Sequence, residues 1–500
     1  MTRQPSRLIG FLSSHGRCQP RHRPWPRYAL EREDWVRLGH NLAANSDWLL
    51  LGLWAEDGPP LARVHAALFD DEGGALAVAS LDCPDGGFPS LGWARPGAIR
   101  LERAVRDLHG LTPVDLVDDR PWLVHDATTP YRFLPVEGWN LHHIPVGPVH
   151  AGIIEPGHFR FTCAGETVVR LEARLGYVHK GIEGLLTGAP LDRAARIVGR
   201  VSGDSTVAYA LAFARAVEAA TQTEAPPRAH HLRALMAELE RLANHLGDIG
   251  AICNDAAFAF LHARCGELRE DVLRIAEACF GHRLMMDRIV PGGVAVDLSE
   301  AAALEMLALV VMLRRRFPRL VKVYDGTSSL QDRTVGTGVL TATLAHRFAA
   351  GGVIGRASSR CFDARVQPGY PPYDKMEFGV PMLIDGDVNA RVWLRIHEVE
   401  ASLGLITRLI ASMPGGPVLA PLKSTRGEES EGMALVEGFR GDVLVWLRLA
   451  ADGVTVLRCH PRDPSWFQWP LLEAAIDGNI VADFPLCNKS FNCSYAGHDL

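Results

Sequence analysis

The longest helical pattern in the chain lies in PPRAHHLRALMAELERLANHLGDI, residues 226–249. Two prolines open it, and proline is tolerated in the first turn of a helix but not in its interior. Apolar side chains then recur at helical spacing and form one stripe, which predicts an amphipathic helix of several turns. A helix of this length buries such a stripe against other helices, so we expect a helical bundle. The stripe consists of Leu232, Leu235, Met236, Leu239, Leu242, Leu246 and Ile249.

The chain before residue 130 has a different pattern. Short apolar runs such as DWLLLGLWAE and GALAVASL are broken by Gly, Pro and Asp, which predicts strands. The stretch PGAIRLERAVRDLHGL has apolar residues at helical spacing and predicts a closing helix. Near the other end of the chain, Asp452-Gly453 predicts the turn of a β-hairpin. The fold class is therefore α+β: an N-terminal α+β module followed by a mainly helical bundle with peripheral β-hairpins. Further helices are expected over 191–220, 260–280, 299–316, 329–348 and 387–411.

A Pro-rich connection, YRFLPVEGWNLHHIPVGPVHAGIIEPGHFRF, places a domain boundary near residue 135. We therefore expect an α+β domain over 28–134 and a second domain over 135–500. Residues 1–27 contain arginines but no acid, which predicts a solvated or partner-binding arm, or alternatively an organelle transit peptide.

Composition excludes several classes of protein. A formal net charge of -6 argues against nucleic acid, since a phosphate-binding surface is basic. The longest apolar helical run, residues 301–313, is too short for a membrane span, and no apolar stretch suited to a secretory signal follows the first arginines. Ten scattered cysteines form no CxxC pair, so we expect reduced thiols and no zinc or iron–sulfur site in this chain.

Two polar stretches are candidates for a site. LHHIPVGPVHAGIIEPGHFRF carries His150, Glu155, His158 and Arg160 in a Gly/Pro-rich loop, which fits a metal site, a proton relay or a solvated loop. The histidine spacing matches no compact set of metal ligands, whereas a buried carboxyl beside a histidine can move protons. The chain ends in SFNCSYAGHDL, which is either half of a metal site or the place where one was lost.

Several stretches together resemble one family. GPVHAGIIEPGHFRF, RLGYVHKGIEG, AELERLANHLGDIG, DRIVPGGV and VEGFRGDVLVWLRL are similar to the large subunit of energy-converting (group 4) nickel-iron hydrogenases and to the homologous 49-kDa-type subunit of respiratory complex I. Upstream, LERAVRDLHGL and DDRPWLVHD resemble the 30-kDa-type complex I subunit, which some relatives carry fused to the front. The resemblance implies that 28–134 is a 30-kDa-type domain and 135–500 a 49-kDa-type domain.

The hydrogenases of this family hold nickel and iron through two CxxC pairs. The matching positions here are Val198 and Val201 near the middle of the chain, and Ser494 and Gly497 at its end. Valine and glycine have no donor atom and serine is a poor ligand for soft nickel. The resemblance therefore implies that this chain binds no metal, and that the terminal segment packs where the metal lies in the hydrogenases.

The resemblance also implies roles for the loop. His150 matches the histidine of the family's GPxH loop, and Glu155 matches a glutamate on a proton path in the hydrogenases. His158 and Arg160 belong to the same motif and are expected at a substrate cavity. Ile154 stands where complex I has a second loop histidine, and no residue is assigned to the quinone-facing tyrosine.

Three hypotheses follow. The first is a metal-free, hydrogenase-like core subunit of a membrane-attached, complex I-related oxidoreductase of the NADH:quinone or hydrogenase-related type, reducing a quinone or another small acceptor with proton transfer. The second is a structural adaptor without a site, and the third a true hydrogenase with unusual ligands. In each, a 4Fe-4S cluster is expected in an iron–sulfur small-subunit-like partner, beside membrane subunits. The chain is expected as a peripheral protein on the cytoplasmic side of the inner membrane.

Overall fold

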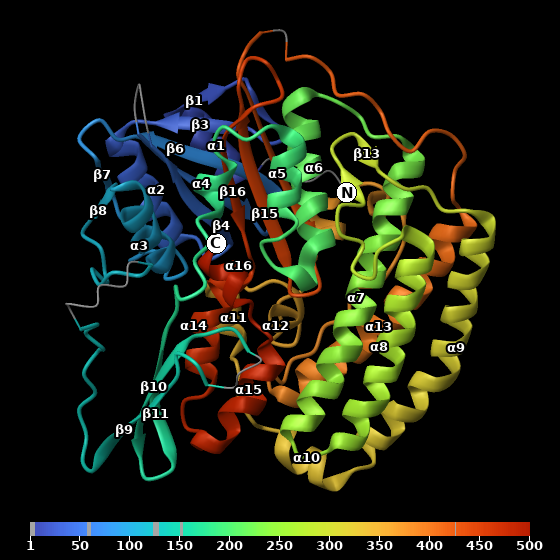
Figure 1. Cartoon of the computed structure of the whole chain (residues 1–500). Coiled ribbons are helices and arrows are strands. Elements are labelled where there is room, and N and C mark those ends of the chain that lie inside the picture. The colour runs from blue at the N-terminus through green and yellow to red at the C-terminus, as the bar shows by residue number, and fades with distance from the viewer. Residues whose placement is uncertain (1–5, 58–61, 124–129, 151–153, 426) are drawn as a thin grey trace.

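The computed structural model describes residues 6–57, 62–123, 130–150, 154–425 and 427–500. A sheet-rich part formed mainly by the N-terminal residues lies beside a bundle of long helices (Figure 1). The predicted α+β class is therefore confirmed. Within the described ranges, no helix is long and apolar enough to cross a membrane.

The N-terminal sheet has five strands in the order β1-β3-β6-β5-β4, with β3 and β6 parallel and the other pairs antiparallel. Every residue of β4 is buried, because the sheet is covered on both faces. Leu49 and Phe69 pack in the core shared with the bundle, whereas Leu50 and Leu68 pack in the core that contains helices α1 to α3. The elements are α1 (Arg7–His15), β1 (Gly16–Gln19), β2 (His22–Arg23), β3 (Arg27–Leu30), α2 (Arg32–Ala44), β4 (Trp48–Glu56), β5 (Arg63–Asp70), β6 (Ala75–Asp82), β7 (Gly87–Pro89), α3 (Ala98–His109) and β8 (Thr112–Val114).

The segment predicted as a basic arm is folded over the part that the structure describes. Helix α1 buries Leu8 and Leu12, and β1 pairs with β3 at the edge of the sheet. Arg27 is buried and donates to Glu431 at 2.6 Å, so it is not a solvated cation. The apolar residues between the arginines determine this outcome, because they supply the buried side of α1. Residues 1–5 lie outside the described ranges, and the domain limits at 27 and 134 remain predictions.

Two further sheets have three and four strands. The order β11-β10-β9 forms a three-stranded antiparallel sheet, and β16-β15-β14-β2 forms a four-stranded sheet in which β2 runs parallel to β14. The predicted hairpin is β15–β16, and the Asp452 side chain accepts from the backbone of Val454 and Thr455 in its turn. The elements are β9 (Leu141–Val146), β10 (His158–Ala164), β11 (Thr167–Arg174), α4 (Ile182–Leu186), α5 (Leu191–Val198), α6 (Thr206–Thr221), β14 (Ser430–Glu437), β15 (Asp442–Leu449), β16 (Val456–Arg462), α14 (Ser465–Ala475), α15 (Phe484–Phe491) and α16 (Tyr495–Asp499).

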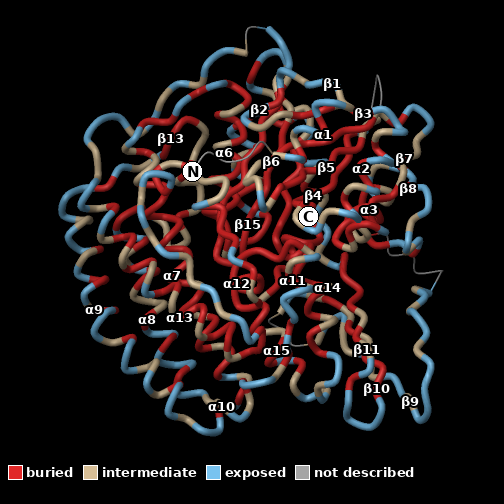
Figure 2. Tube along the Cα trace, turned by 180° about the vertical axis from the view of Figure 1, so that it is seen from behind, coloured by how far each residue is buried: buried red, intermediate tan, exposed pale blue. Residues whose placement is uncertain are grey.

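The bundle contains the helix predicted from the apolar stripe. Helix α7 packs against α8 and α13, and α9 packs on their outer side (Figure 1). Figure 2 shows buried residues throughout the interior and exposed residues along the outer helix α9. The elements are α7 (Pro227–Asp255), α8 (Ala259–Phe280), β12 (Ile289–Val290), β13 (Gly293–Val294), α9 (Glu300–Asp325), α10 (Ser328–Thr334), α11 (Ala342–Arg347), α12 (Gly352–Arg356) and α13 (Val388–Ala411).

Two predicted helices are interrupted. The helix expected over 191–220 ends at Val198 and resumes at Thr206, and the turn between them contains Val201. The helix expected over 329–348 divides into α10 and α11, because Gly336 and Gly338 have positive φ angles of 73° and 61°. The first interruption matters for the site, since it lies at the family's early ligand pair.

Candidate functional site

The loop between β9 and β10 brings His150 and Glu155 to the C-terminal segment. The ends of the loop are held together, because the Gly157 amide donates to the Pro148 carbonyl at 2.9 Å. Gly147 has a φ of +86°, and a Cβ there would collide with the Gly157 carbonyl oxygen, so only glycine fits. The sequence thus closes the loop locally and points it towards α16.

Glu155 and His150 contact two neighbouring residues of α16. The Glu155 carboxylate accepts from the Ala496 amide at 3.1 Å, in the first turn of that helix. The His150 ring lies 6.4 Å from the Tyr495 ring and 5.5 Å from the Phe159 ring, measured between centroids. Its Nε2 is buried and has no hydrogen-bond partner among the described residues, and burial lowers the pKa of His150. Glu155 is itself exposed, so Glu155 and His150 together lie between solvent and the C-terminal segment.

His158 and Arg160 lie on the opposite face of β10 from Phe159. The Arg160 guanidinium lies 4.8 Å from the Phe133 ring centroid, and the His158 ring lies 5.4 Å from the same ring. Burial lowers the pKa of His158, although its Nδ1 lies 3.3 Å from the Gly147 carbonyl. A cavity of about 210 Å³ adjoins Arg160 on this face. The structure therefore divides the four predicted loop residues into two pairs, one on each side of the strand.

The four family ligand positions come from two segments that meet. Val198, the last residue of α5, and Val201, in the turn before α6, are fully buried. The next residue, Ser202, has its hydroxyl 3.0 Å from the Ser494 hydroxyl. Ser494 also accepts from the Gly497 amide at 2.9 Å and so caps α16. All residues of α16 are buried, as expected for a segment that packs inside the protein.

Polar residues that the sequence analysis did not single out complete this region. Tyr209 donates to Asp463 at 2.7 Å, and burial raises the Tyr209 pKa well above its usual value, with the Asp463 charge adding to the effect. Arg440 donates to both oxygens of Asp204 at 2.6 and 2.7 Å. Burial alone would raise the pKa of Asp204, but the charge of Arg440 and the hydrogen bonds from Arg440, Ser202 and Ser205 together outweigh it and lower that pKa. Arg440 stands in the VEGFRGD stretch that carried the family resemblance, which was the available signal.

These residues do not fit a nickel-iron centre. Three of the four ligand positions offer no donor atom, and the Ser494 hydroxyl is already hydrogen-bonded. A Cβ at Gly497 would lie 2.5 Å from Asp463 Oδ2, so a thiolate side chain has no space there. The nearby Cys493 is buried, and burial raises the pKa of its thiol. Within the described part of the chain, no three His, Cys, Asp or Glu side chains are grouped so as to hold a metal ion.

The fold and this terminal packing define a chain like the large subunit of hydrogenases. The family described as "Respiratory-chain NADH dehydrogenase, 49 Kd subunit" matches residues 248–433. "Formate hydrogenlyase subunit 5" of Escherichia coli (strain K12) is 30% identical over 82% of this chain and 77% of that protein. The NADH-quinone oxidoreductase C/D subunit of Bacteroides thetaiotaomicron is 30% identical over 72% of this chain and 68% of that protein.

A solved structure has the same fold. A chain in the "Structure of the membrane-bound sulfane sulfur reductase (MBS), an archaeal respiratory membrane complex" matches with a TM-score of 0.67 and 24% identity, covering 73% of this chain and 100% of that chain. The protein therefore belongs to the family that unites the complex I 49-kDa subunit with the nickel-iron hydrogenase large subunit.

Proposed function

We propose that this chain is a metal-free, hydrogenase-like core subunit of a membrane-attached, complex I-related oxidoreductase. The observation that carries the proposal is the contact between the β9–β10 loop and the C-terminal segment. Glu155 binds the α16 amide, while Ser494 and Gly497 pack against Ser202 and Asp463 instead of presenting thiolates. The loop thus remains at the family's reaction centre although the metal ligands do not.

The chemistry assigned to this region is proton transfer to a reduced acceptor. Glu155 is exposed and Glu155 and His150 both adjoin α16, so they can hand a proton inward from solvent. We assign His158 and Arg160 to the rim of a substrate cavity, since Arg160 lines the space of about 210 Å³ beside Phe133. A quinone or another small acceptor is the proposed substrate. Electrons come from a 4Fe-4S cluster in an iron–sulfur partner, and this chain supplies protons and positions the acceptor.

The partners and location follow the relatives. Similar proteins are named as subunits of a formate hydrogenlyase and of an NADH-quinone oxidoreductase, including C/D fusions. We propose that residues 28–134 form the 30-kDa-type domain of such a fusion. The assembly would hold this chain peripherally on the cytoplasmic side of the inner membrane, beside membrane subunits.

Metal analysis and two substitutions test the proposal. The purified complex should contain no stoichiometric nickel in this subunit. Glu155→Gln and His150→Ala should assemble normally yet lower proton-coupled turnover by roughly a hundredfold, the lower range for general acid–base groups. Val169→Ala, on the exposed side of β11, is the matched control and should keep full turnover.

A structural adaptor is the second candidate, and one observation favours it. The buried Asp463 side chain, hydrogen-bonded by Tyr209, fills the space beside Gly497, which matches a ligand position of the family. An adaptor would dock the iron–sulfur partner onto membrane subunits without taking part in the reaction. Intact assembly with unchanged proton-coupled turnover in both loop variants would favour the adaptor.

A further inference from the structure

Helix α7 carries a second stripe, made of charged and polar side chains. Glu238, Arg241, His245 and Asp248 recur at helical spacing, and none is more than 7% exposed. A polar stripe on a helix normally faces solvent. Here it is enclosed by the bundle.

Helix α13 presents a matching stripe to α7. Its members Arg391, Arg395, Glu398 and Ser402 also recur at helical spacing and are buried. Helices α7 and α13 pack together, and hydrogen bonds join the two stripes directly. We call these eight residues the α7–α13 seam.

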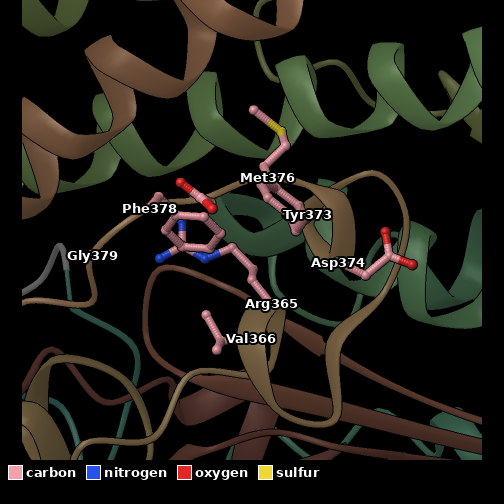
Figure 3. A pocket seen from close by; sticks show the side chains of 8 residues that line it. Arg365, Val366, Tyr373, Asp374, Met376, Phe378 and Gly379 are labelled. Atoms are coloured by element: carbon pink, nitrogen blue, oxygen red, sulfur yellow. The ribbon is translucent and has the colours of Figure 1, made fainter.

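One end of the seam reaches a surface cavity of about 530 Å³. Tyr373 lines this cavity and donates to Glu238 at 2.7 Å, and Arg365 donates to the same carboxylate at 3.0 Å. Figure 3 shows the Arg365 guanidinium beside the Phe378 ring, with Asp374 turned away from it. The outermost carboxylate of the seam is therefore separated from the cavity only by residues that line it.

The middle of the seam contains a histidine–carboxylate pair. His245 Nε2 donates to Glu398 at 2.6 Å, while its Nδ1 is buried with no hydrogen-bond partner among the described residues. Arg241 lies between the two carboxylates, with nitrogens 3.4 Å from Glu238 and 3.7 Å from Glu398. Burial lowers the pKa of His245, with Arg395 and Arg241 acting in the same direction and Glu398 against it. The imidazole is thus neutral at rest and has a free nitrogen for a proton.

The inner end of the seam reaches the C-terminal segment. Asp248 accepts from the Asn492 side chain at 2.8 Å and from Arg395 at 3.0 Å. Asn492 in turn accepts from Arg440 through its carbonyl at 2.5 Å, and it stands two residues before the ligand position Ser494. The seam therefore connects the surface cavity with the region proposed above as the reaction site.

Stability alone does not explain such a seam. Burying ion pairs removes charges from water, and apolar side chains of similar size usually stabilise a core as well or better. Apolar residues at these positions would pack a bundle equally well. A row of buried carboxylates and a histidine that runs from a cavity towards the proposed reaction site is a candidate for a functional path.

We propose that the α7–α13 seam is a route by which protons pass between the cavity beside Tyr373 and the C-terminal segment. The inference rests on the proposed function, because it supplies protons to that same site. A proton from solvent converts the Glu238 carboxylate to the acid, passes beyond Arg241 to the hydrogen-bonded Glu398–His245 pair, and then reaches Asp248. Asp248 releases it beside Asn492 to the C-terminal segment, which hands it on to the acceptor. The acceptor receives its electrons from the partner's cluster. Each carrier returns to its starting form, and no electron crosses the seam.

The test uses the purified complex without added acceptor. Its iron–sulfur clusters are photoreduced with deazaflavin. With no acceptor present, Asp248 retains the proton as compensation for the electron on the cluster, and this uptake is followed with a pH-indicator dye. Glu238→Gln and His245→Asn should slow uptake by at least roughly tenfold, within the range that positioned proton carriers contribute. Tyr373→Phe removes only the hydroxyl at the cavity and should slow uptake less than Glu238→Gln and His245→Asn do. Its D₂O isotope effect should be larger than that of the wild type. A merely structural role would change the melting temperature and not the isotope effect.

Glu102→Gln is the matched control. Glu102 is as buried as Glu238 but lies on α3, where the Ser90 hydroxyl and the Leu91 amide donate hydrogen bonds to it. Uptake in this variant should therefore equal that of the wild type.

Wild-type uptake in a folded Glu238→Gln complex, or no uptake in the wild type itself, would overturn the route. If Glu238→Gln fails to assemble, Tyr373→Phe decides: slowed uptake supports the route and unchanged uptake refutes it. Reduction of decylubiquinone, measured in parallel, tests the proposed function separately, since its failure with normal uptake refutes only the quinone acceptor.

Discussion

The α7–α13 seam and the C-terminal segment adjoin each other but bury polar groups in opposite ways. In the seam, formal charges are close to groups of opposite charge, as with Asp248 beside Arg395 and Glu398 beside Arg356. In the C-terminal segment the ligand positions are neutral, and shape decides the packing, as with Gly497 against Asp463. The difference teaches that one chain can bury polar groups either by pairing opposite charges or by packing neutral groups closely.

Arg356→Met should have the largest effect, because it breaks the charge balance beside the seam. Arg356 is fully buried, donates to Glu437 at 2.8 Å and also binds Glu398. Removing one partner leaves buried carboxylates unpaired, which costs about 3–5 kcal/mol. Thermal and urea unfolding measure the loss. Arg264→Met, which removes an exposed pair with Glu267, should change stability by less than ~1 kcal/mol. Equal effects of the two variants would contradict the distinction.

Glu240→Gln should have the next largest effect, and it appears as a change in pH dependence. Glu240 lies on α7, accepts from the Val207 and Ala208 amides, and burial raises its pKa to about 8. The folded protein therefore keeps a proton that the unfolded chain releases above a pH of about 4.5. Stability should fall as the pH rises towards 8, by at most about 1.4 kcal/mol per pH unit.

Glutamine does not titrate in this range, so the unfolding free energy of the variant should vary less with pH than that of the wild type. Urea midpoints at several pH values, compared with those of the wild type, measure the difference. Parallel pH profiles for the two proteins would show that Glu240 is ionised in the folded state.

Gly497→Ala should have the smallest effect. It tests whether the C-terminal segment is closely packed against its neighbours. The new methyl group would meet the Asp463 carboxylate, which Tyr209 holds in place, at a cost of about 2 kcal/mol. Gly404→Ala in α13, where a Cβ meets nothing within 4 Å, should instead be neutral or stabilising. A melting temperature of Gly497→Ala at or above that of the wild type would mean that this region is loosely packed.

Local sequence determined much of the fold. The apolar stripe of α7 and the apolar run that forms β4 each fix a secondary structure through their own periodicity and length, so both were predictable. The prediction of a basic arm relied on the charge of the residues near the N-terminus. It gave too little weight to the few apolar residues through which α1 packs against the protein. The absence of cysteines at Val198, Val201, Ser494 and Gly497 was likewise visible in the sequence.

The sequence by itself thus determined the main helices and strands and the loss of the thiolate ligands. Only the tertiary structure decided what replaced those ligands and where Glu155 and Asp463 lie, because their partners are far away along the chain. The seam is the clearest case. On α7 the residues Glu238 to Asp248 look like a solvent-facing side, since periodicity separates polar from apolar faces but not exposed from buried ones. The packing of α13 against that side makes it part of the interior.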